Sequence, residues 1–143
     1  MKTILFVCVG NSGRSQMAEA FFNHYAQGKA KALSAGTDPA PSVSRTVISV
    51  MKEVGIDISD KKPKPLTPEM IDQANLVITM GCGAEAACPA SWVETRDWEL
   101  EDPKDKPIEK VREIRDEIKA RVLKLLSQFD RPESKQPELN DYQ

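Results

Sequence analysis

The sequence has few of the residues that zinc sites and disulfide frameworks need. It contains one histidine, His24, and three cysteines, Cys8, Cys82 and Cys88. A single histidine argues against a zinc site built from cysteine and histidine. An odd number of cysteines argues against a structural disulfide framework. The cysteines are therefore reactive thiols, ligands of another metal, or buried core residues.

Long apolar runs are also absent. No uninterrupted apolar stretch approaches the ~18 residues that a membrane-spanning helix needs. The opening segment, MKTILFVCVGNSG, has no small-residue cleavage site and runs directly into a glycine-containing loop. It predicts a strand rather than a secretory signal. We therefore expect a cytoplasmic protein with no membrane partner.

The chain has no excess of basic charge. Its 20 Lys and Arg residues are outnumbered by 22 Asp and Glu residues, which gives a formal net charge of −2. This balance argues against a nucleic-acid partner. Residues 1–50 nevertheless contain five basic and two acidic residues, a local balance of +3. That local charge suits a small anionic ligand near the N-terminus.

Hydrophobic patterning divides the 143 residues into alternating strands and helices. Continuous apolar runs predict buried strands, and apolar residues three or four apart predict helices. The expected strands are 3–9, 31–35, 76–80 and one within 92–98, and the expected helices are 15–26, 43–54, one that begins at Thr67-Pro68 and one from Pro107 to Phe129. This order predicts an α/β fold with a parallel sheet and helices on both faces. We expect one domain over residues 1–129 and a polar tail over residues 130–143.

The loop after the first strand has the composition of an oxyanion site. It consists of Cys8, Val9, Gly10, Asn11, Ser12, Gly13, Arg14 and Ser15 and leads directly into a helix. Its glycines allow a tight turn whose N–H groups, together with the helix N-terminus, attract an anion. Arg14 can hold two anion oxygens, and the same positive field activates the Cys8 thiol as a nucleophile. The alternative interpretation is that Cys8 is a buried residue at a strand end.

A nucleophilic thiol that attacks an oxyanion also needs an acid to protonate the departing oxygen. Asp102, which precedes a proline in the loop before the last helix, is the candidate acid. Nearby carboxylates compete with it for this role by sequence alone: Asp97, Glu99, Glu101 and Asp105.

At this point the sequence resembles a known family. The segments CVGNSGRSQMAEAFF, LSAGT and WELEDP are similar to those of arsenate reductases built on the low-molecular-weight tyrosine phosphatase fold. The resemblance runs from residue 3 to about residue 128. Gln16 stands where the phosphatases usually carry proline, and no tyrosine pair follows Asp102. The resemblance implies a four-stranded parallel sheet, with Cys8 as nucleophile, Arg14 as oxyanion clamp and Asp102 as general acid.

The resemblance also implies roles for the two remaining cysteines. Cys82 would attack the arsenate adduct on Cys8, and Cys88 would take over the disulfide and present it to thioredoxin. Five residues separate Cys82 from Cys88, one fewer than in the well-known thioredoxin-linked members. A relay through glutaredoxin, glutathione or mycothiol therefore stays open. The enzyme would need an external thiol reductant, and phosphate or sulfate would compete with arsenate.

No tightly bound cofactor is expected, although some relatives bind a potassium ion. Asn11, Glu19 and Ser34 match three of its ligands, and the fourth, an acidic residue, would fall within the Lys/Pro-rich loop DKKPKPL. Two other functions remain alternatives to arsenate reduction. One is a phosphatase acting on phosphotyrosine or a small phosphoester, and the other is a non-catalytic oxyanion-binding or redox-sensing module.

Overall fold

The computed structural model describes residues 2–80 and 94–129. The predicted relay cysteines, Cys82 and Cys88, lie outside the described residues, and so does the expected tail over residues 130–143. All other residues singled out from the sequence can be located.

The centre of the molecule is a four-stranded sheet. Its strands are β1 (Lys2–Cys8), β2 (Ala30–Gly36), β3 (Leu76–Thr79) and β4 (Glu94–Asp97). They are ordered β2-β1-β3-β4, and every neighbouring pair is parallel. The predicted four-stranded parallel sheet is therefore confirmed. β1 lies between two neighbours, which explains why its sequence is a continuous apolar run rather than an alternating one.

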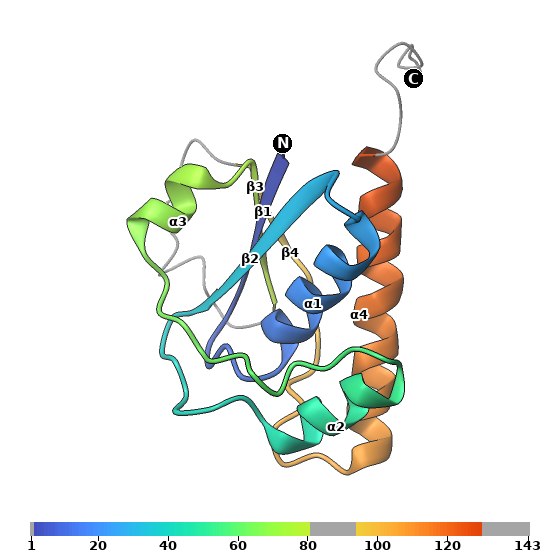
Figure 1. The fold of residues 1–143 in the computed structure, drawn as a ribbon. Helices are drawn as coiled ribbons and strands as arrows, with labels where there is room; N and C mark the ends of the chain where they lie inside the picture. The colour runs from blue at the N-terminus through green and yellow to red at the C-terminus, as the bar shows by residue number, and fades with distance from the viewer. Residues whose placement is uncertain (1, 81–93, 130–143) are drawn as a thin grey trace.

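Helices cover both faces of this sheet, as predicted. They are α1 (Arg14–Ala26), α2 (Arg45–Glu53), α3 (Pro68–Gln73) and α4 (Ile108–Phe129). Figure 1 shows α1 and α4 side by side on one face, α2 near the lower end of α4, and α3 on the opposite face. Thr67 caps α3 by accepting a hydrogen bond from the Met70 N–H, which confirms the predicted start of that helix.

Alternate residues of β1 enter two separate cores. Ile4, Phe6 and Cys8 belong to the larger core, which the strands form with α1, α2 and α4. Leu5 and Val7 belong to the smaller core beneath α3. This alternation follows from the two-residue period of a strand. It places Cys8 at the carboxyl end of the central strand, with its side chain on the α1 side.

An ion-pair cluster ties α2 to α4. Glu53, at the end of α2, accepts hydrogen bonds from Arg112 and Arg115 of α4. The hydrogen bond from Arg112 is the main cause of a lowered pKa at Glu53. The cluster holds α2, and the segment that leads into it, at a defined distance from α4. Within residues 2–80 and 94–129, no helix has the length and apolar character that crossing a membrane requires.

β2 ends at Gly36, where two backbone segments approach each other closely. A Cβ atom at this position would lie 2.5 Å from the carbonyl oxygen of Val9 and 3.0 Å from the backbone nitrogen of Asn11. Both neighbours are backbone atoms of the loop that follows β1, so neither can move aside by a side-chain rotation. Glycine at position 36 therefore lets β2 and this loop pack together.

We predict that Gly36→Ala lowers the free energy of unfolding by about 3 kcal/mol, the upper range for overpacking a tight site. It should also weaken phosphate binding, because the loop must shift. Urea unfolding and calorimetric titration with phosphate measure the two effects. Gly55→Ala is the control, because Gly55 has a positive φ of 84° but nothing within 4 Å of the added Cβ. That variant should lose stability and keep phosphate binding, and equal phosphate affinity in both variants would contradict the prediction.

Candidate active site

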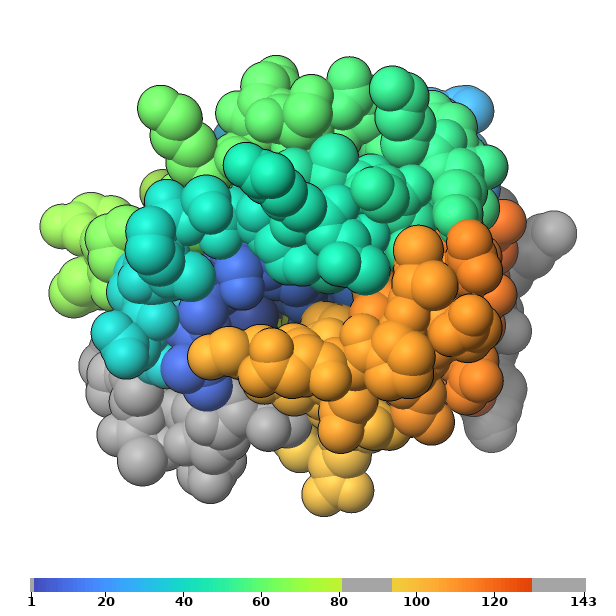
Figure 2. All heavy atoms as spheres, turned by 90° about the horizontal axis from the view of Figure 1, so that it is seen from below, coloured from blue at the N-terminus to red at the C-terminus, as the bar shows by residue number. Residues whose placement is uncertain are grey.

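Three segments enclose a cleft at the carboxyl end of the sheet. The cleft has a volume of about 740 Å³ and is lined by parts of the loop over residues 8–14, by the segment over residues 38–46 and by residues 102–106. In Figure 2 the blue atoms of the N-terminal segment lie at the floor of this hollow. Cyan-green atoms of the segment after β2 flank it on one side, and orange atoms of the segment before α4 on the other. Ligands of parallel α/β proteins bind at this edge of the sheet.

The loop after β1 is anchored through its carbonyl groups. The carbonyls of Cys8, Val9, Gly10 and Ser12 accept hydrogen bonds from the N–H groups of Thr37, Asp38, Ala40 and Ser44, at 2.9 to 3.0 Å. No described residue accepts a hydrogen bond from the N–H groups of residues 10–13. The loop therefore uses its acceptors for anchoring and keeps donors available for an anion. This agrees with the composition of the oxyanion loop.

A buried polar network lies behind the Cys8 sulfur. The Oγ of Ser15 is 2.8 Å from the Cys8 Sγ, and the Nδ2 of Asn11 donates to Ser15 Oγ at 2.7 Å and to Ser34 Oγ at 3.0 Å. Asn11 is fully buried and has a positive φ of 51°. Asparagine tolerates this left-handed conformation better than most residues. The structure thus brings together the four residues Cys8, Asn11, Ser15 and Ser34.

Gln16 supports the same loop, a role that sequence reasoning missed. Its side chain is buried, and its Nε2 lies 3.2 Å from the Asn11 carbonyl, 3.1 Å from Asn11 Oδ1 and 3.1 Å from the Lys62 carbonyl. The amide therefore joins the loop to the segment that precedes α3. Only the comparison with proline at this place in phosphatases distinguished Gln16 in the sequence.

Arg14 is held from behind by backbone oxygens. Its Nη1 donates to the Met80 carbonyl at 2.5 Å and to the Leu100 carbonyl at 3.2 Å. Its Nη2 lies 3.7 Å from Asp102 Oδ2, and the side chain is almost completely buried. These anchors fix the guanidinium at the cleft, where its other N–H groups can contact an oxyanion.

The structure distinguishes Asp102 from the neighbouring carboxylate Glu101. Asp102 lines the cleft, its side chain is 59% exposed, and it lies opposite Arg14. Glu101 is instead paired with Lys106 and Lys110 at 3.2 and 3.3 Å. The hydrogen bond from Lys106 is the main cause of a lowered pKa at Glu101, so this carboxyl is held ionised.

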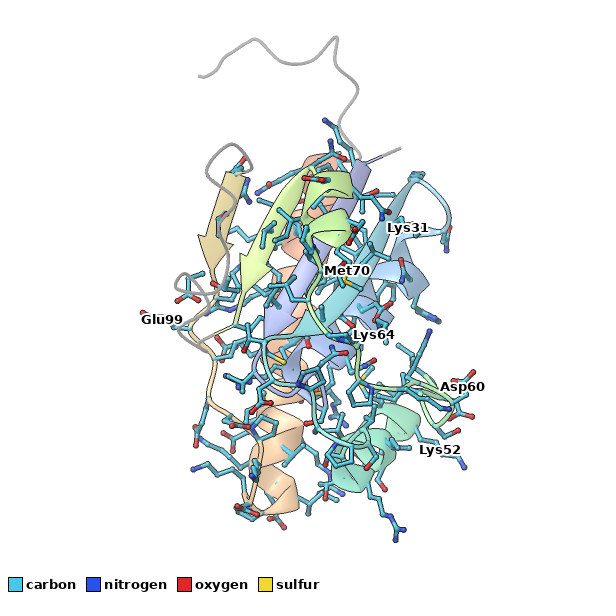
Figure 3. The ribbon with its side chains drawn as sticks, turned by 90° about the vertical axis from the view of Figure 1, so that its left-hand side faces the viewer. Lys31, Lys52, Asp60, Lys64, Met70 and Glu99 are labelled. Carbon is cyan, nitrogen blue, oxygen red and sulfur yellow. The ribbon has the colours of Figure 1, made fainter. Side chains whose placement is uncertain are left out.

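The remaining carboxylates differ in their position relative to the cleft. Asp97 accepts a hydrogen bond from Thr79 Oγ1 at 2.7 Å, and Glu99 is exposed at the edge of the molecule in Figure 3. Asp105 lines the cleft as Asp102 does. Asp105 is thus the one rival among these four that shares the cleft with Asp102.

A close contact joins the loop to the acid-bearing segment. A Cβ atom at Gly13 would lie 3.0 Å from Pro103 Cγ, so glycine at this position lets the proline pack directly on the loop. Pro103 follows Asp102, whose Oδ1 accepts a hydrogen bond from the Lys104 N–H at 3.0 Å. The contact positions Asp102 above the loop, and nothing in the sequence indicated it.

This geometry defines a class of protein. A parallel α/β fold places a buried cysteine at the end of an interior strand, within an anion-binding loop. An arginine and an exposed carboxylate line the same cleft. Such a site can bind a tetrahedral oxyanion and present a thiol to its central atom. The family model for low molecular weight phosphotyrosine protein phosphatases matches residues 3–135. The chain belongs to this family.

Several relatives within the family are arsenate reductases by name. A putative arsenate reductase of Halobacterium salinarum is 39% identical over 130 residues, which cover 87% of this chain and 91% of the relative. A glutaredoxin arsenate reductase of Synechocystis is 39% identical over 132 residues, which cover 90% of this chain and 99% of the relative. A solved thioredoxin-dependent arsenate reductase of Corynebacterium glutamicum is 41% identical with a TM-score of 0.79. That match covers 90% of this chain and 62% of the solved chain.

We predict that Ser15→Ala slows alkylation of Cys8 by iodoacetamide at neutral pH by about tenfold or more. A hydrogen bond to a charged group is worth roughly 1.5–3 kcal/mol, and the reactive species is the thiolate. The rate is read by mass spectrometry on the peptide that contains Cys8, so that reaction at other cysteines does not contribute. Ser127→Ala, on the exposed side of α4, is the control. Equal rates in both variants would show that Ser15 does not act on the sulfur.

Proposed function

We propose that this chain is an arsenate reductase in which Cys8 is the nucleophile. The observation that carries the proposal is the set of relatives: arsenate reductases about 39% identical to this chain align with almost its whole length. The site geometry supports the same reaction, because the loop supplies donors for a tetrahedral oxyanion next to a buried thiol. The catalytic unit is residues 1–129.

The first step is formation of a covalent adduct. Arsenate binds to the N–H groups of the loop over residues 9–15 and to the Arg14 guanidinium. The Cys8 thiolate attacks the arsenic atom, and an As–O bond breaks. Asp102 gives its proton to the departing oxygen, which leaves as water. The arsenic remains As(V) in this step, because one oxygen ligand has been exchanged for sulfur.

The second step reduces the arsenic. The Cys82 thiolate attacks the Cys8 sulfur, a Cys8–Cys82 disulfide forms, and the S–As bond breaks. The electron pair of that bond stays on arsenic, so As(V) becomes As(III) and leaves as arsenite. Cys88 then attacks Cys82 and releases Cys8 as a thiolate, which leaves a Cys82–Cys88 disulfide. The two electrons thus come from the cysteines.

An external dithiol or thiol must reduce this last disulfide. The relatives differ in the partner their names give, since one is a glutaredoxin arsenate reductase and another is thioredoxin-dependent. We favour thioredoxin, with glutaredoxin or a low-molecular-weight thiol as the alternative. A relay of this kind needs thiols that are kept reduced, which places the reaction in the cytoplasm.

A phosphotyrosine phosphatase would use the same loop, arginine and acid, but the cleft walls do not favour it. The described residues that line the cleft include Pro39, Ala40, Pro41 and Pro103, and none of them is aromatic. A phosphotyrosine ring would therefore have no aromatic side chain to stack on in this part of the chain. A small oxyanion needs no such surface.

The proposal is tested by comparing two activities of the purified protein. Arsenite formation is measured with one of three reductants: thioredoxin with NADPH and thioredoxin reductase, glutathione with NADPH and glutathione reductase, or glutaredoxin added to the glutathione system. Hydrolysis of p-nitrophenyl phosphate is measured in parallel. We expect arsenite formation with at least one reductant. Phosphate-ester turnover without arsenite formation in any of the three would show that the chain is a phosphatase. Binding of oxyanions without either activity would show a non-catalytic module.

We predict that Asp102→Asn slows adduct formation by about 10²–10⁴-fold, the usual contribution of a general acid. The amide keeps the size of the side chain and loses the proton that the departing oxygen needs. Rapid-quench mass spectrometry of the arsenic-bearing protein measures the rate. Asp105→Asn is the matched comparison, since this carboxylate lines the same cleft. A larger loss in the Asp105 variant would assign the acid to that residue instead.

A further inference from the structure

The three residues that match potassium ligands do lie together, but their donor atoms do not suit a potassium ion. Ser34 Oγ donates to Glu19 Oε1 at 2.5 Å, and Asn11 lies beside Ser34. The backbone N–H of Lys64 contacts Asn11 Oδ1 at 2.8 Å. Since a backbone N–H can only donate, this atom must be the amide oxygen, and the amide nitrogen therefore faces Ser34. A potassium ion would need oxygen atoms there.

A positive charge from the chain itself lies at the same place. The Nζ of Lys64 is 3.7 Å from Glu19 Oε1, the oxygen that also accepts from Ser34. Lys64 belongs to the Lys/Pro-rich loop in which the resemblance placed an acidic fourth ligand. The residue that the structure brings to Glu19 from this loop is thus a cation, with the opposite charge.

We propose that Lys64 is a positioning residue whose ammonium group replaces a bound potassium ion beside Glu19 and keeps Glu19 as the acceptor at the far end of the hydrogen-bond network that reaches Cys8. The proposal goes beyond arsenate reduction and rests on the proposed function only in taking Cys8 as the nucleophile.

The direction of the network follows from the donors and acceptors. An ionised carboxylate only accepts, so Ser34 must give its single hydroxyl hydrogen to Glu19. Ser34 Oγ then accepts from the Asn11 amide, whose other hydrogen goes to Ser15 Oγ. Ser15 is left with its own hydroxyl hydrogen, and the Cys8 sulfur lies 2.8 Å from it. The network therefore donates to Cys8, which is the polarity that a thiolate requires.

A carboxylate at Glu19 leaves Ser34 Oγ free to accept from the Asn11 amide, whereas a protonated carboxyl could donate to Ser34 Oγ and compete with that amide. The Glu19 side chain is 11% exposed, and a charge in such a place needs a partner of opposite sign. Lys64 is its ion-pair partner in the described part of the chain.

The backbone of Lys64 is fixed on both sides. Its N–H binds Asn11, its carbonyl accepts from the Gly36 N–H at 2.8 Å, and Pro65 forms a β-bridge with Gly36. Lys61 and Lys62, in the same loop, are exposed, whereas Lys64 is half-buried. Figure 3 shows Lys64 at the lower end of the sheet, between α3 and the segment that carries Asp60. The ammonium is therefore presented to Glu19 by a clamped segment.

The test uses the reactivity of Cys8 in the full chain without arsenate. Lys64→Gln should react about tenfold more slowly with iodoacetamide at the Cys8 peptide and show a smaller thiolate absorbance in the ultraviolet. Lys64→Arg should restore both readouts, because it keeps the charge. Lys61→Gln removes a charge from the exposed part of the same loop and should match the wild type. The proposal would be overturned if Cys8 in Lys64→Gln reacted as fast as in the wild type. It would also be overturned if Lys64→Arg folded normally and its Cys8 still reacted slowly.

A second measurement addresses the ion directly. Thermal unfolding of the wild type is followed in potassium chloride and in sodium chloride at equal ionic strength. We expect the same midpoint in both salts, because Lys64 already supplies the cation. A midpoint raised by potassium alone would overturn the proposal by showing that a bound ion lies beside Glu19. Neither measurement involves arsenate. If the protein had no arsenate reductase activity, the proposed function would be refuted, and the two measurements would still test the role of Lys64.

Discussion

The Asn11 side chain is the interaction on which the active-site loop depends. Its amide group uses its full hydrogen-bonding capacity, because the nitrogen donates to Ser15 and Ser34 while the oxygen accepts from Gln16 and from the Lys64 backbone. All of these contacts are made by a fully buried residue with a left-handed backbone. A buried polar group that lost any of these partners would be costly, so the loop has one defined shape.

This shape joins the sheet to the chemistry. Cys8 is presented by the end of the central strand, Ser15 by the first turn of α1, and Arg14 is anchored by carbonyl groups that follow β3 and β4. Pro103 packs against Gly13 and carries Asp102 to the open side of the same cleft. The anion-binding groups are thus fixed before any ligand arrives, which is the condition for electrostatic stabilisation of a transition state.

The parts of this site that lie close together in sequence could be predicted, and the parts that come from distant segments could not. The loop from Cys8 to Ser15 was found because a strand, two glycines, an arginine and a helix start follow one another directly. The contacts of Gln16 and Lys64 join residues 46 and 53 positions apart, so no local pattern indicates them. Matching residue types leave a potassium site possible, whereas the orientation of the Asn11 amide is visible only in three dimensions. Asp102 could be chosen among five acidic residues through the Asp-Pro pair and the family resemblance, but its position 3.7 Å from the Arg14 guanidinium is visible only in the structure.

The central claim is that the two electrons that reduce arsenic come from the cysteines. They reach arsenic through the Cys8 sulfur, and the resulting disulfide then passes to Cys82 and Cys88. The most direct test is disulfide mapping of the reduced wild-type protein after one turnover with arsenate and no external reductant. The account predicts one arsenite per protein molecule and a Cys82–Cys88 disulfide, with Cys8 recovered as a free thiol. Arsenite released only when an external thiol is present, with that thiol joined to Cys8 and the other two cysteines still free, would contradict the relay.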